Sequence, residues 1–271
     1  MKRVLVLGDS IRDIYRHFTA TRLCPEGPVP VLVEDGGWDC RAGGADLVAH
    51  QLTELFEDPS VPILCTGSYS EKERLMADDR LMLRIDRDSV GISNPELYLA
   101  SIETQLRETK FDAIIVSDYD KGAFEEPLAN WLVRRADDFN TPVFVDAKKN
   151  WHWYRGSFTM FPNDRENSAG INKYARHIIH KLGPGGCKVD GVHIPTKNHA
   201  VRDVTGAGDV FLAAFVYKMI ELGLPGNSSV LLPEQPILEI AARFANKVAG
   251  ISVEYVGTHC VTKEELDKHS D

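Results

Sequence analysis

Residues 203–209 read Asp-Val-Thr-Gly-Ala-Gly-Asp and carry the clearest chemical signal in the sequence. Gly206 and Gly208 have no side chains, so successive backbone N–H groups can face one point. These groups stand at the start of an apolar helical run, where backbone donors are unpaired and the helix dipole is positive. We therefore expect Gly206, Ala207 and Gly208 to form an anion site suited to a phosphate group.

Asp209 lies in the first turn of that expected helix, beside the anion site. A carboxylate there can take a proton from an attacking hydroxyl, as phosphoryl transfer to an alcohol requires. The same string also suits a simpler interpretation, in which Gly-x-Gly makes a tight turn and Asp209 caps a helix. An isolated Gly-x-Gly favours the simpler interpretation, so other parts of the chain must distinguish the two.

Short β-branched runs alternate with helical patterns along the chain. Residues 4–7, 113–116 and 143–145 are apolar and predict buried strands, whereas the apolar spacing in residues 44–56 and 127–136 predicts helices. This alternation indicates a mostly parallel sheet with helices on both faces.

Two other segments break the alternation. Residues 29–34 and 81–86 resemble strands without crossover helices, and we expect them to pair as a small sheet over a cleft. The last third is helical, since residues 210–222 are apolar almost all round and residues 236–253 carry an apolar stripe. Gly223 and Pro225 supply stop signals between these two helices.

The composition of the 271 residues, 43% hydrophobic and 26% charged, is that of an ordinary globular protein. The net charge of -9 argues against nucleic acid or an anionic membrane as the main partner. No apolar run approaches the length of a signal peptide or a membrane span. The five cysteines are scattered without a Cys-x-x-Cys pair, so we expect a cytoplasmic protein with reduced thiols.

Further stretches, together with residues 203–209, resemble the ribokinase/PfkB family of carbohydrate kinases. They lie in the family's order over nearly the whole chain, at residues 8–15, 22–31, 43–45, 82–86, 117–122, 145–148, 162–166, 245–250 and 257–258. The Pro-Glu-x-Pro-Val-Pro-Val and Ser-Asp-Tyr-x-Lys-Gly patterns are most similar to the kinase module of the bifunctional heptose-7-phosphate kinase/adenylyltransferases. The sequence ends at Asp271, so the kinase half alone is expected.

This resemblance implies a single ribokinase-like domain over residues 1–271. Its fold would be a three-layer α/β/α arrangement with a central, mostly parallel sheet and a small β-sheet lid from about residues 15–42 and 79–90. Its activity would be ATP-dependent transfer of the γ-phosphate to a sugar hydroxyl, with Asp209 as the base. If the subgroup holds, that hydroxyl is at C1 of a heptose 7-phosphate. Kinases of ribose- or fructose-type sugars or of nucleosides, and a non-catalytic sugar- or nucleotide-binding protein, remain as alternatives.

The resemblance also implies roles for residues outside the 203–209 string. On the acceptor side, Asp13 in the turn after the first strand and Gly43 and Gly44 would contact the sugar, and Lys148 and Arg84 would bind a phosphate already on it. The nucleotide side would use Lys181, Gly183, Gly185, Thr205, Asn246 and Gly257. Asn163 and Glu166 would hold Mg²⁺ or its waters. The expected donor is ATP with Mg²⁺, and a monovalent cation is a further candidate.

Some positions depart from the family pattern. Leu47 stands where the family usually has an Asn that touches the sugar, so the acceptor pocket is altered. Lys181 replaces a common Thr, and residues 67–81 and 166–178 are shorter than expected, which thins one flank of the sheet. The lid edges would suit a partner chain, so a homodimer through the lid sheet stays open.

Overall fold

The computed structural model describes residues 2–78, 80–88, 92, 94–166, 170–197, 199–223 and 234–269. Pro225 and residues 79, 89 and 90 of the predicted lid therefore lie outside the described residues. The elements in chain order are β1 (Val4–Leu23), β2 (Pro30–Gly44), α1 (Ala45–Phe56), β3 (Pro62–Ala77), β4 (Arg80–Arg87), α2 (Pro95–Glu108), β5 (Ala113–Asp118), α3 (Glu126–Asp138), β6 (Val143–Ala147), η1 (Trp151–Tyr154), β7 (Ser157–Met160), η2 (Ile171–Lys173), β8 (Ala175–Lys181), η3 (Gly183–Gly185), β9 (Cys187–Val189), β10 (Val192–Ile194), α4 (Ala207–Glu221), α5 (Glu234–Ser252) and α6 (Lys263–Lys268).

The described strands form one sheet in the order β10-β9-β8-β7-β6-β5-β1-β3-β4, and β2 pairs with β1. The strands from β8 to β3 along this order run parallel to their neighbours. The other four, β2, β4, β9 and β10, are added in antiparallel pairings. The predicted mostly parallel central sheet is confirmed.

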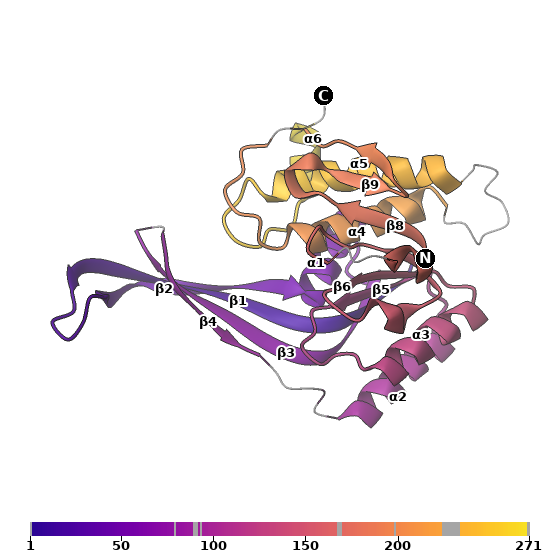
Figure 1. The fold of residues 1–271 in the computed structure, drawn as a ribbon, viewed down its shortest axis with the longest axis horizontal. Helices are drawn as coiled ribbons and strands as arrows, with labels where there is room; N and C mark the ends of the chain where they lie inside the picture. Colours follow the sequence, from indigo (N-terminus) through magenta and orange to yellow (C-terminus); the bar gives the residue numbers. More distant parts are fainter. Residues whose placement is uncertain are drawn as a thin grey trace.

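Side chains of the central strands alternate between two buried clusters, one on each face of the sheet. In β1, Val4 and Val6 pack in the cluster that contains α1, α4 and α5, whereas Leu5 and Leu7 pack in the cluster that contains α2 and α3. Figure 1 shows the two helical layers on either side of the sheet. The three-layer α/β/α arrangement is therefore confirmed. Among the described helices, none combines the length and the apolar character needed to cross a membrane.

Four helices, α1, α3, α4 and α5, lie where the apolar spacing predicted them. Helix α2 was not predicted, because polar and charged residues interrupt its apolar positions throughout. Its signal was the spacing of Tyr98, Ile102 and Leu106, which recur every fourth residue and are its buried side chains.

Strand β1 does not end near Gly8, as the sequence suggested, but continues to Leu23 through a register shift between Gly8 and Asp9. A Cβ atom on Gly8 would collide with the carbonyl oxygen of Ser117, so glycine lets β1 and β5 approach each other here. Asp13 consequently lies within a strand, and its predicted position in a turn is wrong.

Beyond the body of the protein, β1 and β3 continue side by side and are flanked by β2 and β4. We call this projection, residues 10–23, 30–44, 70–77 and 80–87, the arm; its strand order is β2-β1-β3-β4. It stands out from the α/β body in Figure 1. The predicted pairing between residues 29–34 and 81–86 is wrong, because these segments lie on opposite edges of the arm. The short stretch 67–81 leaves no room for a helix, so β3 runs directly from the body into the arm.

Candidate active site

The predicted anion turn leads directly into α4. Gly206 is the N-cap of this helix with φ of 78°, and no side chain among the described residues caps it. A Cβ atom on Gly206 would lie 2.5 Å from Cδ2 of Leu47 and 2.9 Å from Cγ2 of Thr258, so both the φ value and the packing require glycine. The N–H of Ala207 donates to the carbonyl of Val204 at 3.3 Å, while the positive end of the helix dipole and the other N–H groups of this uncapped turn remain available to an anion.

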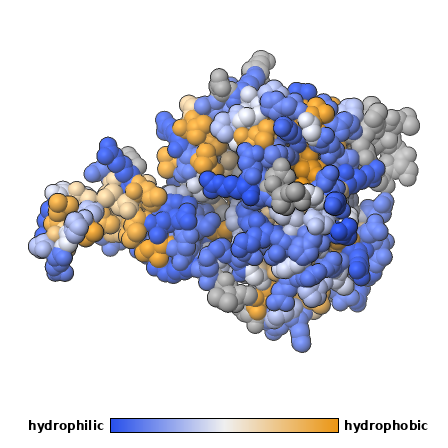
Figure 2. Space-filling view, in the orientation of Figure 1, coloured by the Kyte–Doolittle hydropathy of each residue, from blue (hydrophilic) through white to orange (hydrophobic). Residues whose placement is uncertain are grey.

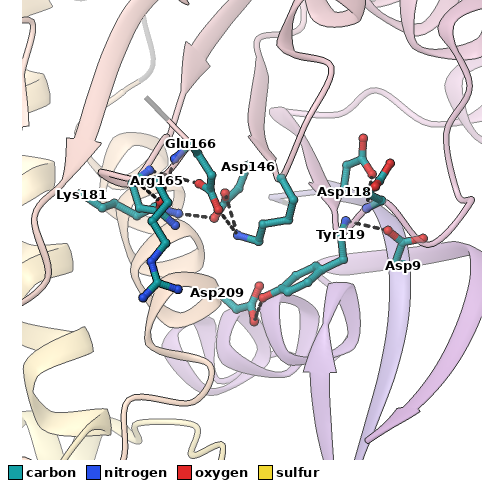
Figure 3. Close-up of polar contacts among 11 residues, drawn as sticks. Asp9, Asp118, Tyr119, Asp146, Arg165, Glu166, Lys181 and Asp209 are labelled. Atoms are coloured by element: carbon teal, nitrogen blue, oxygen red, sulfur yellow. Dashed lines mark hydrogen bonds and ion pairs between the residues drawn. The ribbon is translucent and has the colours of Figure 1, made fainter. Parts of the chain in front are cut away.

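Asp209 is buried in the first turn of α4 and is only 2% exposed. Its Oδ2 accepts a hydrogen bond of 2.8 Å from the hydroxyl of Tyr119, as Figure 3 shows. Its Oδ1 is buried and has no hydrogen-bond partner among the described residues. Burial raises the pKa of Asp209 to about 6. At neutral pH the group is mainly a carboxylate with one oxygen fixed by Tyr119 and the other without a hydrogen-bond partner among the described residues, so it could accept a proton.

Two lysines and two acids form a cluster of ion pairs near Asp209, and Figure 3 labels three of them, Asp146, Glu166 and Lys181. Lys148 Nζ lies 3.1 Å from Glu166 Oε1 and 3.4 Å from Asp146 Oδ1, while Lys181 pairs with the second oxygen of Asp146. Burial acts to raise the pKa of Asp146, but the two lysines outweigh it and lower that pKa. For Lys148, burial acts to lower the pKa, and the carboxylates of Asp146 and Glu166 outweigh it and raise it. Lys148 is therefore held charged.

Lys181 and Lys148 lie beside different parts of the site. A Cβ atom on Gly208 would lie 3.6 Å from Nζ of Lys181, so that ammonium group is next to the anion turn. Lys148 Nζ lies 4.8 Å from the ring centroid of Tyr119. Lys148 thus lies beside Tyr119, whose hydroxyl binds Asp209. Arg84, predicted to act with Lys148, is exposed on β4 of the arm and pairs with Asp86 at 2.8 Å. Their role in binding a phosphate on the sugar stays a prediction.

Asn163 and Glu166, predicted to hold Mg²⁺, bind each other's backbone. Asn163 Oδ1 accepts from the N–H of Glu166 at 3.1 Å, and Glu166 Oε2 accepts from the N–H of Asn163 at 3.1 Å. No group of three or more acids, histidines or cysteines among the described residues forms a metal cage. Glu166 alone provides too few ligands for a dedicated metal cage. It suits Mg²⁺ that arrives bound to ATP, because such an ion has phosphate oxygens and water as most of its ligands.

The acceptor-side residues Asp13, Gly43 and Gly44 are brought together at the root of the arm. Gly43 lies so close to β1 that a Cβ atom on it would be 2.6 Å from Oδ2 of Asp13. Asp13 is 2% exposed and forms an ion pair with Arg74, a partner that the sequence did not suggest. Leu47, the departure from the family pattern, is buried and packs against the anion turn.

The predicted nucleotide residues occupy separate places. Thr205 donates its hydroxyl to Asp203 at 2.7 Å, directly before the anion turn. The N–H of Gly257 donates to the same carboxylate at 2.9 Å, but this glycine lies against Tyr15 and Arg41 of the arm.

Besides Lys181, Thr205 and Gly257, three further residues were predicted to bind the nucleotide. Gly183 and Gly185 are in the exposed turn η3, and Asn246 donates to the carbonyl of Ile194 at 3.0 Å. Their nucleotide-binding roles stay predictions.

Tyr119 was not assigned from the sequence, although it lies within the Ser-Asp-Tyr-x-Lys-Gly run. Its loop is held by Asp9, which is fully buried and accepts from the N–H groups of Tyr119 at 2.6 Å and Ala123 at 3.0 Å. One signal for this part of the site was present in the sequence. Asp9 of β1 and Asp118 of β5 each come just after an apolar run, and neighbouring parallel strands bring such residues to the same edge of the sheet core.

Comparison with known sequences places this geometry in context. Residues 162–264 match the family described as pfkB family carbohydrate kinase. The bifunctional protein HldE of Vibrio vulnificus is 30% identical over 314 aligned positions that cover 97% of this chain and 62% of the relative. HldE of Syntrophotalea carbinolica is 31% identical with the same coverage. The chain thus spans 62% of the length of these curated relatives, and the alignments exceed its own 271 residues, as the shortened segments require.

Solved structures share the fold. Ribokinase from Giardia lamblia has a TM-score of 0.68 at 14% identity and covers 98% of both chains. Phosphofructokinase-2 from Escherichia coli has a TM-score of 0.69 at 13% identity, covering 98% of this chain and 97% of the other. The family match over residues 162–264 and the shared fold agree with each other, so this part of the chain is similar to the pfkB carbohydrate kinases and the whole chain has a ribokinase-like fold.

Proposed function

We propose that this protein is an ATP-dependent kinase that transfers the γ-phosphate of ATP to a hydroxyl of a sugar or sugar phosphate. The observation that carries the proposal is Asp209, a buried carboxylate with one oxygen fixed by Tyr119, the other unpartnered, and the uncapped start of α4 beside it. The arrangement supplies a base and an anion site to the same small volume.

The chemistry then follows from the geometry. The acceptor hydroxyl donates to Oδ1 of Asp209, and its oxygen attacks the γ-phosphorus as the bond to the leaving ADP oxygen breaks. Asp209 takes the proton, and the Tyr119 hydrogen bond keeps the carboxylate oriented. Backbone N–H groups of the 206–208 turn, with Lys181, face the charge of the transferred phosphoryl group. Mg²⁺ enters as part of the MgATP substrate, with Glu166 as the nearest candidate to bind its waters.

Substitution of the base tests the proposal. Asp209→Asn preserves the shape and can still accept the Tyr119 hydrogen bond, but it cannot take a proton. We expect the turnover number with MgATP to fall at least 10³-fold, while ATP binding stays within about threefold. Full phosphotransfer activity in Asp209→Asn, measured as ADP formed across a panel of sugars and sugar phosphates, would disprove the assignment of the base.

For the acceptor, we propose C1 of a heptose 7-phosphate-like sugar. Support comes from the motifs shared with the heptose-7-phosphate kinase modules and from the HldE relatives. Buried Leu47 beside Gly206 alters the pocket, so ribose- or fructose-type sugars and nucleosides belong in the same substrate panel. A non-catalytic binding protein on this fold is the competing function, and it predicts sugar or ATP binding without any ADP release.

The assembly state is a second part of the proposal. Large apolar side chains are exposed on the arm, and Figure 2 shows them gathered on this projection. They are Leu23, Val33 and Trp38 in β1 and β2 and Leu81, Met82 and Leu83 in β4. An exposed apolar sheet with free edges is the kind of surface that a second chain covers. We therefore propose a homodimer through the arm. A cytoplasmic location is a separate part of the proposal and rests on the scattered cysteines of the sequence.

A further inference from the structure

The register of the arm places seven of its charged residues, together with Tyr15, in two rows on one face. Residues directly opposite each other in paired strands point to the same side of a sheet. The first row, nearer the body, is Arg41, Asp13, Lys72 and Asp86. The second row is Asp39, Tyr15, Arg74 and Arg84. This inner face contains the predicted acceptor residue Asp13, so its charges bear on what the acceptor can be.

The ion pairs on this face run between the two rows. Arg41 pairs with Asp39 at 2.9 Å, Arg84 pairs with Asp86 at 2.8 Å, and Arg74 pairs with Asp13. Each carboxylate of the two rows is thereby matched with one guanidinium group. Lys72 is the remaining cation, and it has no ion-pair partner among the described residues.

Lys72 is also the member of these rows that reaches the base. It is half-buried, and its Nζ lies 5.3 Å from the ring centroid of Tyr119, whose hydroxyl binds Asp209 at 2.8 Å. One tyrosine ring and one hydrogen bond therefore separate the ammonium group from the base. A sugar whose hydroxyl lies at Asp209 can place a phosphate on its far end beside Lys72.

We propose that Lys72 is the residue that recognises an anionic group, a phosphate monoester, on the acceptor. This inference rests on the proposed kinase function and assigns the phosphate subsite within it. The other cations predicted for that role are already neutralised, Lys148 by Asp146 and Glu166 and Arg84 by Asp86. A charge without a carboxylate partner keeps its full attraction for a ligand, whereas a paired one must first lose its partner.

The test compares Lys72→Gln with the wild-type protein on matched acceptors: ribose with ribose 5-phosphate, fructose with fructose 6-phosphate, and sedoheptulose with sedoheptulose 7-phosphate. We expect KM for the phosphorylated sugars to rise about 10- to 100-fold, with KM for ATP and for the free sugars unchanged. Lys72→Arg should recover most of the loss. Lys188→Gln, which removes an exposed lysine of β9, is the control for loss of one charge and should match the wild type.

Two outcomes would overturn the inference while leaving the kinase intact. One is a wild-type protein that prefers the free sugars, and the other is Lys72→Gln lowering kcat equally for both members of a pair, as a purely positioning contact with Tyr119 predicts. If no acceptor is turned over, the proposed kinase function fails. The phosphate subsite at Lys72 is then tested by calorimetry with the same sugars and sugar phosphates. Tighter binding of the phosphates than of the free sugars, lost in Lys72→Gln, supports the subsite, and equal binding by both proteins rejects it.

Discussion

Strand β1 lies in two different environments along its length. In the body, Val4–Leu7 is fully buried on both faces, between two apolar clusters. In the arm, the same strand carries Asp13 and Tyr15 on one face and leaves Arg12 and His17 exposed. The body thus surrounds the charged residues of the candidate site with apolar packing. The arm, by contrast, is held by ion pairs on its inner face. Changes in the body should therefore affect chemistry with every acceptor, and changes in the arm should affect stability, acceptor choice or assembly.

Removal of Lys148 should give the largest effect on turnover. Lys148→Met withdraws the cation shared by Asp146 and Glu166, and the pKa of Asp209, which Lys148 lowers and Asp146 raises, should then increase. We expect kcat to fall about 10²- to 10³-fold with every acceptor, and the acid limb of the pH–rate profile to move to higher pH. The control is Lys149→Met, whose side chain is 69% exposed and pairs with Asp120 at the surface. Equal losses in the two variants would contradict the assignment.

In the arm, removal of Arg74 should chiefly lower stability. Arg74→Met leaves the buried carboxylate of Asp13 without its cation, which lowers the free energy of unfolding by about 3–5 kcal/mol in urea titrations. The double variant Arg74→Met/Asp13→Asn should regain much of this loss, since the stranded charge is gone. The exposed pair offers the contrast, because Arg84→Met should lower stability by less than about 1 kcal/mol.

The raised pKa of Asp209 predicts opposite pH effects on activity and on stability. Activity, measured as kcat/KM, should fall about tenfold per pH unit below about 6, because the protonated acid cannot act as a base. Above that pH the buried carboxylate lowers stability, since its folded pKa exceeds its unfolded one. Asp209→Asn should then be more stable than the wild type at pH 8, by roughly 2 kcal/mol, and the gain should shrink as pH falls through 6 towards 4. A pH-independent difference in thermal unfolding would contradict this.

The smallest effect on the isolated chain is expected at Trp38, which pairs with Arg16 midway along β2. Trp38 is 62% exposed and alternates along β2 with Asp39, so it points away from the charged face. Trp38→Ser should change the free energy of unfolding by no more than about 0.5 kcal/mol. If the arm joins two copies, the same variant should lower the mass measured by light scattering. An unchanged mass would remove Trp38 from the interface.

The sequence predicted the body better than the arm, for a physical reason. Strands buried on both faces are short continuous apolar runs, so 113–116 and 143–145 were found within about two residues of β5 and β6. The arm portions of β1 and β3 contain charged residues on their inner face, such as Asp13, Lys72 and Arg74. Their strand character depends on pairing with distant segments, which no local pattern reveals.

A similar contrast holds for the candidate site. The turn at residues 203–209 and the position of Asp209 at the start of α4 could be located from sequence, because glycines and an acid before an apolar helix form a local signal. Tyr119 and Asp146 could not be assigned, since each acquires its role only when strands β5 and β6 place it opposite α4. The ion pairs of Asp13 with Arg74 and of Lys148 with Glu166 likewise depend on tertiary contacts and not on neighbours in the chain.

The central place of β1 also bears on the order in which the chain folds. Residues 4–8 pair with Pro62–Thr66 of β3 on one side and with Ala113–Ser117 of β5 on the other, although they leave the ribosome before either partner. The strands of the arm, β1 to β4, all precede β5, so the arm can assemble while the second flank of β1 is still unpaired. Asp146, Lys181 and Asp209 emerge afterwards, and the nascent protein therefore presents its acceptor-side surface well before it has the means to catalyse transfer.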